Sequence, residues 1–523
     1  MKLKMIKKYI SDEYKIKKEG NVLSYAVPVA DIVQVCNDLY FKHKLQLKLI
    51  TALDDRENTG QFKIFYVFGI SPENIFLLPY ISLKDEEEFP SITKLIHEAS
   101  SYERKIYTFF GLRPKDHPHM TQILLHENWP DKVFPLRKDF KYQTRPDYVD
   151  GVYESQKVEG EGVYEIPVGP VHAGIIEPGH FRFSVAGEKI LLLKPRLGYK
   201  HKGIEKLFEV LPISDKVRLS ERVSGDTSFT HSMAFCQSIE MLADIDVTER
   251  VKYLRVIFSE LERLANHLND IGFIMLDTGY SFGGSNCARL REVIMQWNER
   301  LTNSRFLRGV NMIGGIQKDI PIKLCHELLL TLKKIKHDFN EIIAVSQSSS
   351  SVINRLSGTG NVAKQVAVDH GLIGISGRSI GIKHDARIEY PYAAYNKLNF
   401  DMALEEKGDV LARWSVRIKE VSTSISILEQ AILEMPSDNN ILHNKNNFAL
   451  RSNSYSIGIA EGWRGDIVYF VATDSKGEIA RVDVRDPSFI NWTILEHSVN
   501  EDIIPDFPLI NKSFNLSYSG NDL

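Results

Sequence analysis

Two segments of the chain repeat apolar residues at the spacing of an α-helix over many turns. In one, apolar residues recur at positions 410, 414, 418, 421, 425, 428 and 432. In the other, the same spacing runs from 251 to 268, behind Thr248, which can cap a helix N-terminus. Amphipathic helices of this length bury their apolar stripes against one another. The sequence therefore predicts a helical bundle and ends the earlier helix before Gly272.

Strand signals lie on both sides of these helices. The period of a half-buried strand links Phe62, Ile64, Tyr66 and Phe68. Apolar residues from 92 to 109 follow a helical period that Gly111 closes. Further short strands, separated by turn residues, are predicted at 163–168, 181–185, 189–193, 467–472 and 478–484.

The apolar pattern lapses into charge and glycine between 141 and 162. Such a stretch is typical of an exposed linker between domains. The predicted fold class is therefore α+β. Residues 1–140 form a small N-terminal α+β domain, and residues 163–523 form a large, mainly helical-bundle domain with small antiparallel sheets.

Composition excludes several classes of function. The 65 Lys and Arg against 68 Asp and Glu leave no basic excess for a nucleic-acid backbone. No apolar run approaches the roughly 20 residues that cross a bilayer, so no transmembrane segment is predicted. The cysteines, which form no Cys-x-x-Cys pair, suit a reducing cytoplasm; they are Cys36, Cys236, Cys287 and Cys325. The sequence also lacks a Walker-type phosphate loop and a Gly-x-Gly-x-x-Gly turn after a strand.

One turn between two predicted strands concentrates titratable residues among glycines. It spans 169–182 and contains His172, Glu177 and His180. Histidine titrates near neutral pH and a desolvated glutamate can be moved towards it, so this turn suits proton transfer. A surface hairpin whose polar groups are satisfied is the alternative interpretation.

Three further segments are unusual in composition. Small polar residues, among them Ser224 and Thr227, crowd a predicted helix start at 221–232, where helix capping explains them as well as chemistry does. A turn at 461–465 places Arg464 before a strand, and small polar residues fill 515–522. For these two segments, a solvated turn and a solvated tail are the alternatives.

Taken in order, motifs of the C-terminal part resemble the large subunit of group 4, energy-converting [NiFe] hydrogenases of the formate-hydrogenlyase type, and the hydrophilic D subunit of respiratory complex I. These motifs are GPVHAGIIEPGHFRF (169–183), LGYKHKGIEKLFE (197–209), DTGYSFGG (277–284), RLRE (289–292), SGRSIGIKHDARIEYPYAAY (376–395) and GDVLARWSVRIKE (408–420). The N-terminal part is similar to the C subunit of complex I through YERKIYTFFGLRPKDHP (102–118) and PLRKDF (135–140), although Thr108 stands where that family usually has aspartate. The resemblance implies that both units are fused in one chain.

The resemblance also indicates where nickel ligands would lie. The nickel–iron centre of these hydrogenases needs two Cys-x-x-Cys pairs, whose soft thiolates hold the metal. Ser224 and Thr227 occupy the first pair of positions, and Ser517 and Gly520 occupy the second, for which 486–488 is a less suitable register. The resemblance thus implies a chain without metal or cofactor of its own. It also leads us to expect no C-terminal maturation extension beyond Leu523.

Quinone reduction is the other chemistry of the family, and it uses a Tyr and a His in complex I. Gly225 stands where that Tyr is expected, whereas His172 or His180 can supply the imidazole. Arg464 matches the Arg of the family's Glu-Ala-Pro-Arg-Gly turn, from which Trp463 and the glycine before it depart. The resemblance therefore leaves quinone as an open possibility.

The resemblance implies that the four unusual segments surround one cavity. In it we expect His172, Glu177 and His180 to carry protons and Arg464 to hold a carboxylate or an anionic acceptor. We also expect Glu177, Arg464 and Asp522 to interact mainly with one another, with the histidines and with water, because isolated buried charge is costly.

The implied function is that of an oxidoreductase subunit in a membrane-associated, complex I-like or hydrogenase-related assembly. It supports electron transfer from an iron–sulfur small subunit to a quinone or another acceptor, coupled to ion translocation by antiporter-like membrane subunits. The implied location is peripheral, on the cytoplasmic side of the membrane. NAD binding is implied only through the association of the family with NAD. A non-catalytic scaffold is the alternative, and an active hydrogenase is a third interpretation.

Overall fold

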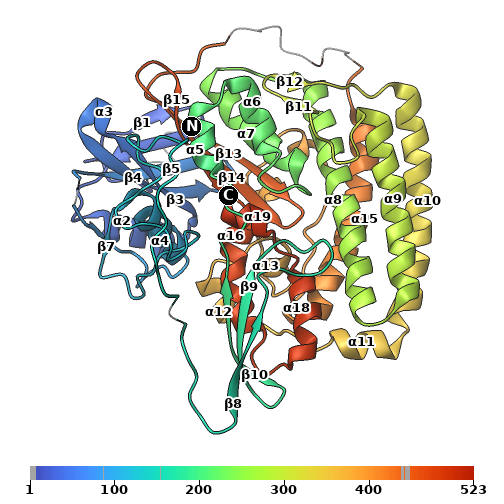
Figure 1. The fold of residues 1–523 in the computed structure, drawn as a ribbon. Coiled ribbons are helices and arrows are strands. Elements are labelled where there is room, and N and C mark those ends of the chain that lie inside the picture. The colour runs from blue at the N-terminus through green and yellow to red at the C-terminus, as the bar shows by residue number, and fades with distance from the viewer. Residues whose placement is uncertain (1–7, 86, 154, 438–440, 442–447) are drawn as a thin grey trace.

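The computed structural model describes residues 8–85, 87–153, 155–437, 441 and 448–523. Its N-terminal part is built on a five-stranded sheet in the order β1-β2-β5-β4-β3, in which β2 and β5 run parallel and the other neighbours antiparallel (Figure 1). The strands are β1 (Lys17–Glu19), β2 (Val22–Ala26), β3 (Gln46–Asp55), β4 (Gln61–Ile70) and β5 (Ile75–Leu83). Two helices pack against this sheet, α2 (Ile32–Asn37) and α4 (Ala99–Phe110).

Strand β4 is buried on both faces, so the prediction of a half-buried strand is wrong. Phe65 and Val67, on the face expected to meet solvent, are fully buried. The ring of Phe65 lies 4.8 Å from that of Tyr455 and 5.2 Å from that of Phe470, both on strands of the C-terminal part. The second domain therefore covers the face that the alternation leaves open.

Helix α4 begins at Ala99, seven residues later than the apolar pattern indicates. The Glu103 carboxylate accepts hydrogen bonds from the Ile92 amide at 2.7 Å and from the Thr93 hydroxyl at 2.7 Å. These bonds hold the preceding stretch as turns, in which Ile92 and Ile96 are still buried. Burial alone therefore produced the helix-like spacing before Ala99.

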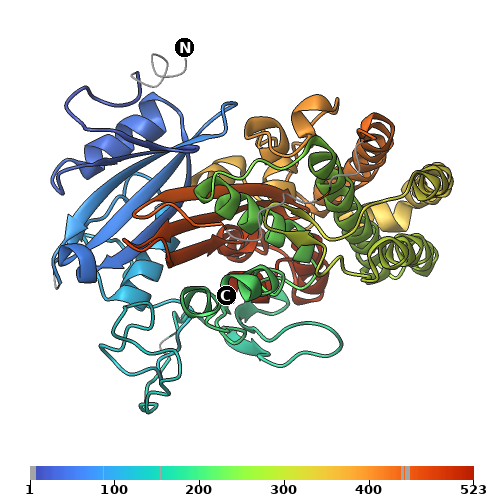
Figure 2. The ribbon, with the colours of Figure 1, turned by 90° about the horizontal axis from the view of Figure 1, so that it is seen from above.

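Four long helices stand side by side and form the predicted bundle: α8 (Glu249–Asp277), α9 (Ser281–Thr302), α10 (Ile322–Gln347) and α15 (Val410–Glu434) (Figures 1 and 2). Thr248 caps α8 as expected, since its hydroxyl accepts the Val251 amide at 3.3 Å. The expected end before Gly272 is wrong, because α8 continues to Asp277. A Cβ on Gly272 would lie 2.9 Å from Cβ of Cys287, so this glycine permits close packing of α8 on α9.

Two three-stranded antiparallel sheets complete the C-terminal part. The first comprises β8 (Val163–Val168), β9 (His180–Ala186) and β10 (Lys189–Arg196), all predicted from the sequence. The second comprises β13 (Tyr455–Gly462), β14 (Gly465–Thr473) and β15 (Ile479–Arg485), of which β13 was not predicted. Its Gly458 packs against the backbone of α7 (Ser228–Leu242), where a Cβ would meet the Ala234 carbonyl oxygen at 1.9 Å.

The remaining elements are short. They are η1 (Asp38–Lys42), α3 (Arg56–Thr59), β6 (Phe89–Pro90), β7 (Pro114–Lys115), α5 (Ile204–Val210), α6 (Ile213–Ser220), β11 (Asn311–Met312), β12 (Gly315–Ile316), α11 (Ser350–Leu356), α12 (Lys364–Asp369), α13 (Gly374–Arg378), α14 (Ala386–Glu389), η2 (Tyr395–Lys397), α16 (Pro487–Asn491), η3 (Trp492–Ile494), α17 (Leu495–Ser498), η4 (Ile504–Asp506), α18 (Phe507–Phe514) and α19 (Tyr518–Asp522). The described residues of 141–162 contain neither helix nor strand. None of the described helices is long and apolar enough to cross a bilayer. The predicted α+β class is confirmed.

A buried lysine joins the two parts of the chain. Nζ of Lys48, on β3, lies 3.2 Å from the Asp466 carboxylate and 3.4 Å from Nε2 of His384. Arg485 donates to the Lys48 carbonyl at 3.1 Å and pairs with Asp466 at 2.7 Å. Burial lowers the pKa of Lys48. Lys48 of the N-terminal part therefore forms one buried charged cluster with Asp466, His384 and Arg485 of the C-terminal part.

We expect Lys48→Met to lower the free energy of unfolding by about 3 kcal/mol, because it removes one partner from a buried ion pair. Thermal and urea unfolding of the variant measure this loss. Lys18→Met, at an exposed position on β1, is the control and should leave stability unchanged. Equal stability of both variants would contradict the expectation.

Candidate functional site

The structure brings together Ser224, Thr227, Ser517 and Gly520, the four positions that the resemblance aligns with nickel ligands; we call them the hydroxyl site. The hydroxyls of Ser224 and Ser517 hydrogen-bond to each other at 2.9 Å, and the Gly520 amide donates to the Ser517 oxygen at 2.8 Å. Thr227 joins through Asp226, whose Oδ1 accepts bonds from Ser224 at 3.1 Å and from Thr227 at 3.0 Å. Segments about 290 residues apart therefore form one hydrogen-bonded unit.

Local backbone requirements place Ser517. It is the N-cap of α19, and its own amide donates to the Ser488 hydroxyl at 2.9 Å. Trp492 Nε1 donates to the Ser517 carbonyl at 3.2 Å. The segment at 486–488, the alternative register for the second pair of ligand positions, therefore also lies at this site, because α16 packs against α19.

The predicted capping of α7 by Thr227 or Ser224 is wrong. Thr227 stands at the N-cap position without a side-chain capping bond. Glu262 of α8 caps the helix instead and accepts bonds from the Phe229 amide at 2.7 Å and the Thr230 amide at 3.1 Å. Burial raises the pKa of Glu262 to about 7. No local pattern marks this role, because the partners lie more than 30 residues apart in sequence.

Arg464 binds Asp226 in a two-pronged ion pair. Nη1 and Nη2 each lie 2.7 Å from one carboxylate oxygen, and Cζ lies 3.8 Å from the centre of the Trp463 ring. Nε also donates to the Asn515 carbonyl. Burial alone would raise the pKa of Asp226, but the charge and hydrogen bonds of Arg464 hold it below its usual range. The carboxylate on Arg464 is therefore Asp226, not Glu177 or Asp522 as expected.

Glu177 and Asp522 are bound elsewhere along the C-terminal segment. Glu177 accepts the Ser519 amide at 2.9 Å, which ties the exposed hairpin to α19. Asp522 accepts the Lys200 amide at 2.8 Å, and burial raises its pKa. Lys202 Nζ donates to the Ser519 hydroxyl and lies near Glu177. The two carboxylates therefore flank α19 rather than pairing with Arg464.

The two candidate histidines bond their own hairpin. Nε2 of His172 lies 2.7 Å from the Gly179 carbonyl oxygen, and Nδ1 of His180 lies 3.4 Å from that of Gly169. Burial lowers the pKa of His180. Glu177, by contrast, reaches beyond the hairpin and accepts a backbone amide of α19. Of the three expected proton carriers, it is the one tied to the C-terminal half of the site.

A buried Asp–His–Tyr series lies behind the hydroxyl site. Nε2 of His231 is 3.0 Å from Asp486, and Nδ1 is 3.0 Å from the Tyr469 hydroxyl. Burial would raise the pKa of Asp486, but His231 and Arg464 lower it. Gly520 stands against this carboxylate, since a Cβ there would lie 2.5 Å from Cγ of Asp486. A ligand-bearing side chain at 520 would therefore displace Asp486.

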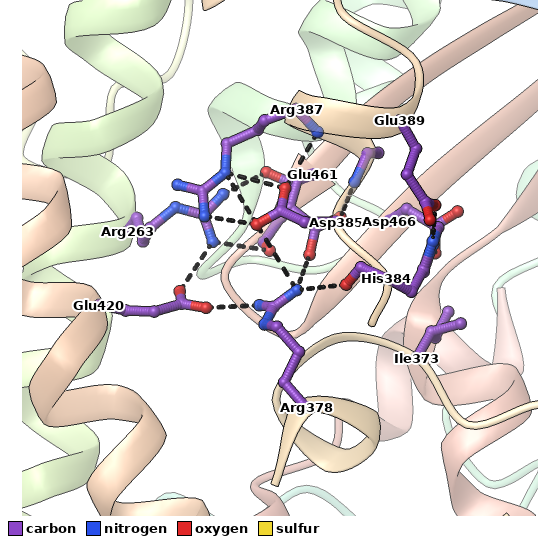
Figure 3. Close-up of polar contacts among 12 residues, drawn as sticks. Arg263, Ile373, Arg378, His384, Asp385, Arg387, Glu389, Glu420, Glu461 and Asp466 are labelled. Carbon is purple, nitrogen blue, oxygen red and sulfur yellow. Dashed lines mark hydrogen bonds and ion pairs between the residues drawn. The ribbon is translucent and has the colours of Figure 1, made fainter. Parts of the chain in front are cut away.

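Buried ion pairs fix the turn that carries Arg464 (Figure 3). Arg263 donates to the carbonyl oxygens of Glu461 at 2.6 Å and Gly462 at 3.1 Å. Arg378 donates to the Glu461 carboxylate at 2.8 Å and to Glu420 of α15 at 2.6 Å. The turn is thus held from α8, α13 and α15 at once.

Three buried groups near this turn lie close enough to hold a metal. The ligand atoms of His384, Glu461 and Asp466 are within 4.8 Å of one another. Each carboxylate already has cationic partners, Arg378 for Glu461 and Arg485 for Asp466. Burial and Lys48 would lower the pKa of His384, but Asp466 and Glu389 raise it to about 9. This arrangement favours an ion-pair cluster over a metal site.

Comparison with known proteins decides the family. Models described as "Respiratory-chain NADH dehydrogenase, 49 Kd subunit" and "30 Kd subunit" match residues 277–457 and 25–146. Formate hydrogenlyase subunit 5 of Escherichia coli is 30% identical over 510 residues, which cover 96% of this chain and 89% of that protein. The chain belongs to this family of hydrogenase and NADH dehydrogenase subunits.

Two further relatives support this assignment. Hydrogenase-4 component G of Escherichia coli is 31% identical over 499 residues, 94% of this chain and 86% of that protein. The C/D subunit of NADH-quinone oxidoreductase of Phocaeicola vulgatus is 29% identical over 459 residues, 84% of this chain and 87% of that protein. The resemblance seen in the motifs, and the fusion of two family units in one chain, are confirmed.

We expect Gly520→Ala to lower the free energy of unfolding by about 1–3 kcal/mol, since the added methyl group overpacks Asp486. Denaturant unfolding measures the loss. Gly160→Ala is the control, because a Cβ there meets only the Val163 side chain at 3.2 Å. A Gly520→Ala variant as stable as its parent would show that Asp486 can shift to accommodate the methyl group without a loss of stability.

Proposed function

We propose that the chain is the large subunit of a membrane-associated oxidoreductase and supports electron transfer without a nickel–iron centre. An iron–sulfur partner subunit would supply the electrons, a quinone or another acceptor would take them, and antiporter-like membrane subunits would couple the transfer to ion translocation. The chain would sit peripherally on the cytoplasmic face. The hydroxyl site supports this proposal, because the positions that the resemblance aligns with nickel ligands lie together and carry no thiol.

The residues at the hydroxyl site do not fit a nickel–iron group. Serine and threonine hydroxyls are poor ligands for a metal that the family holds with soft thiolates. Gly520 offers no side-chain atom, and Ser224 bonds directly to Ser517 at 2.9 Å. The proposed chemistry therefore involves only this chain's polar groups and an acceptor brought to them.

Two polar features of the site are placed to contact an acceptor: the Arg464–Asp226 pair and the Glu177 carboxylate. The side chain of Asp226 is 39% exposed while that of its partner Arg464 is 5% exposed, so the pair can be reached from one side. Reduction of a quinone to a quinol takes up two electrons and two protons. Glu177, on the exposed hairpin that touches α19, is suited to hold one such proton at its carboxylate.

A non-catalytic scaffold is the second candidate. It is favoured by the pairing of Arg464 with Asp226 and by the local bonds of His172 and His180, which leave little unsatisfied polarity. An active hydrogenase is disfavoured by the ligand positions. Activity of the assembled complex separates these interpretations.

We expect the chain isolated from its own host to contain far less than one nickel per chain. The reason is the lack of a thiol at Ser224, Thr227, Ser517 and Gly520. Elemental analysis by mass spectrometry of the purified complex measures this. About one nickel per chain would refute the proposal.

In the intact complex, we expect Glu177→Gln to reduce turnover, or the protons moved per electron, by about tenfold or more, because the amide cannot take up a proton. Assembly should be unchanged, since the amide oxygen still accepts the Ser519 amide. Glu188→Gln, at an exposed position in the neighbouring β-turn, is the matched control.

The outcome of this test decides between the two candidates. Normal turnover and coupling in both Glu177→Gln and His172→Ala would mean that the polar groups of the site take no part in the reaction. The scaffold interpretation would then replace the catalytic one.

A further inference from the structure

Four arginines near the hydroxyl site have no salt bridge to a carboxylate of the described residues. Arg218 lies on α6, Arg222 in the turn after it, Arg291 on α9 and Arg308 in the loop that follows α9. Within the described ranges, no carboxylate forms a salt bridge with any of them. Other arginines of α9 are paired, for example Arg289 with Asp338 at 3.1 Å. We call these four side chains the arginine face.

Two members of the arginine face lie beside the loop that carries Ser224 and Thr227. Arg308 donates to the Gly225 carbonyl at 3.3 Å and to the Ser228 hydroxyl at 3.4 Å. Arg291 lines a cleft beside Asp226. The face is therefore continuous with the site, but none of its members is part of the Arg464–Asp226 pair.

One buried carboxyl lies near three of these arginines. Glu221 is near Arg218, Arg222 and Arg308, and one carboxylate balances at most one of the three guanidinium charges. Its carboxylate accepts the Gly309 amide at 2.6 Å, which fixes the loop after α9. A positive excess therefore remains on the exposed side.

The dimensions favour an extended partner over a small ligand. The cleft beside Asp226 has a volume of about 20 Å³, which suits one water-sized group. The arginines instead spread over α6, α9 and two turns, and Phe306 next to them is 44% exposed. Arg308 lies 5.4 Å from the centre of that ring. Arginine with exposed aromatic residues is typical of protein interfaces.

We propose that the arginine face docks an acidic segment of a partner protein subunit, whose carboxylates pair with the guanidinium groups around Phe306. This inference rests on the proposed function, in which the chain works inside a complex. Unpaired arginines buried by a neighbour need carboxylates, because an unpaired charge in an interface is costly. Docking here places the partner at the mouth of the hydroxyl site.

Carbodiimide cross-linking of the native complex tests the proposal. This reagent joins an amine to a carboxylate with no spacer and does not couple guanidinium groups. We therefore expect Arg222→Lys and Arg308→Lys, made separately, each to add a cross-link from that position to an Asp or Glu of another subunit. Arg289→Lys is the positive control and should cross-link to Asp338 within the chain.

Charge reversal provides the second measurement. We expect Arg218→Glu combined with Arg222→Glu to reduce the partner retained on the purified chain at least tenfold at 150 mM salt, while Arg289→Glu leaves it unchanged. Circular dichroism and thermal unfolding check that the variants fold.

Three outcomes would overturn the proposal. They are cross-links confined to this chain, normal retention after charge reversal, and binding of the arginine face to phosphatidylglycerol vesicles with the complex unaffected. Each would leave the proposed function standing if turnover persists. Loss of turnover with normal cross-links would instead contradict the proposed function and leave the docking inference intact.

Discussion

Arg378 is the ion on which the architecture of the C-terminal part depends. It pairs with Glu420 of the bundle at 2.6 Å and with Glu461 of the second sheet at 2.8 Å (Figure 3). All three side chains are buried, and a buried charge without its partner costs several kcal/mol. Bundle and sheet must therefore meet in one geometry, and Lys48 extends the same constraint to the N-terminal sheet through Asp466.

The site follows from that constraint. Arg263 holds the backbone of Glu461 and Arg378 holds its carboxylate, so the start of the turn that carries Arg464 is fixed. Arg464 then fixes Asp226, and Asp226 accepts the hydroxyls that stand at two of the ligand positions. The positions of the hydroxyl site are therefore set from the bundle, through Glu461, Arg464 and Asp226.

From periodicity the sequence predicted the long helices α8 and α15 and six of the strands, and through the resemblance it implied that four distant segments meet. It failed where tertiary contacts decide. The second face of β4 is covered by another domain, α8 passes Gly272 because α9 packs on it, and α7 is capped by Glu262. The partner of Arg464 was also missed, because nothing in the pattern at 221–232 distinguishes Asp226 from a solvated turn residue.

Charge balance indicates what kind of acceptor suits such a site. The Asp226 carboxylate neutralises Arg464 with two bonds of 2.7 Å, so the pair carries no net charge. An anion would have to displace Asp226 and leave that carboxylate partly buried without its main partner, at a cost of a few kcal/mol. A neutral carbonyl compound needs only a hydrogen bond from the exposed side and disturbs neither charge. The Arg464–Asp226 pair itself, unlike the arginine face beside it, therefore suits a neutral hydrogen-bond acceptor better than an anion.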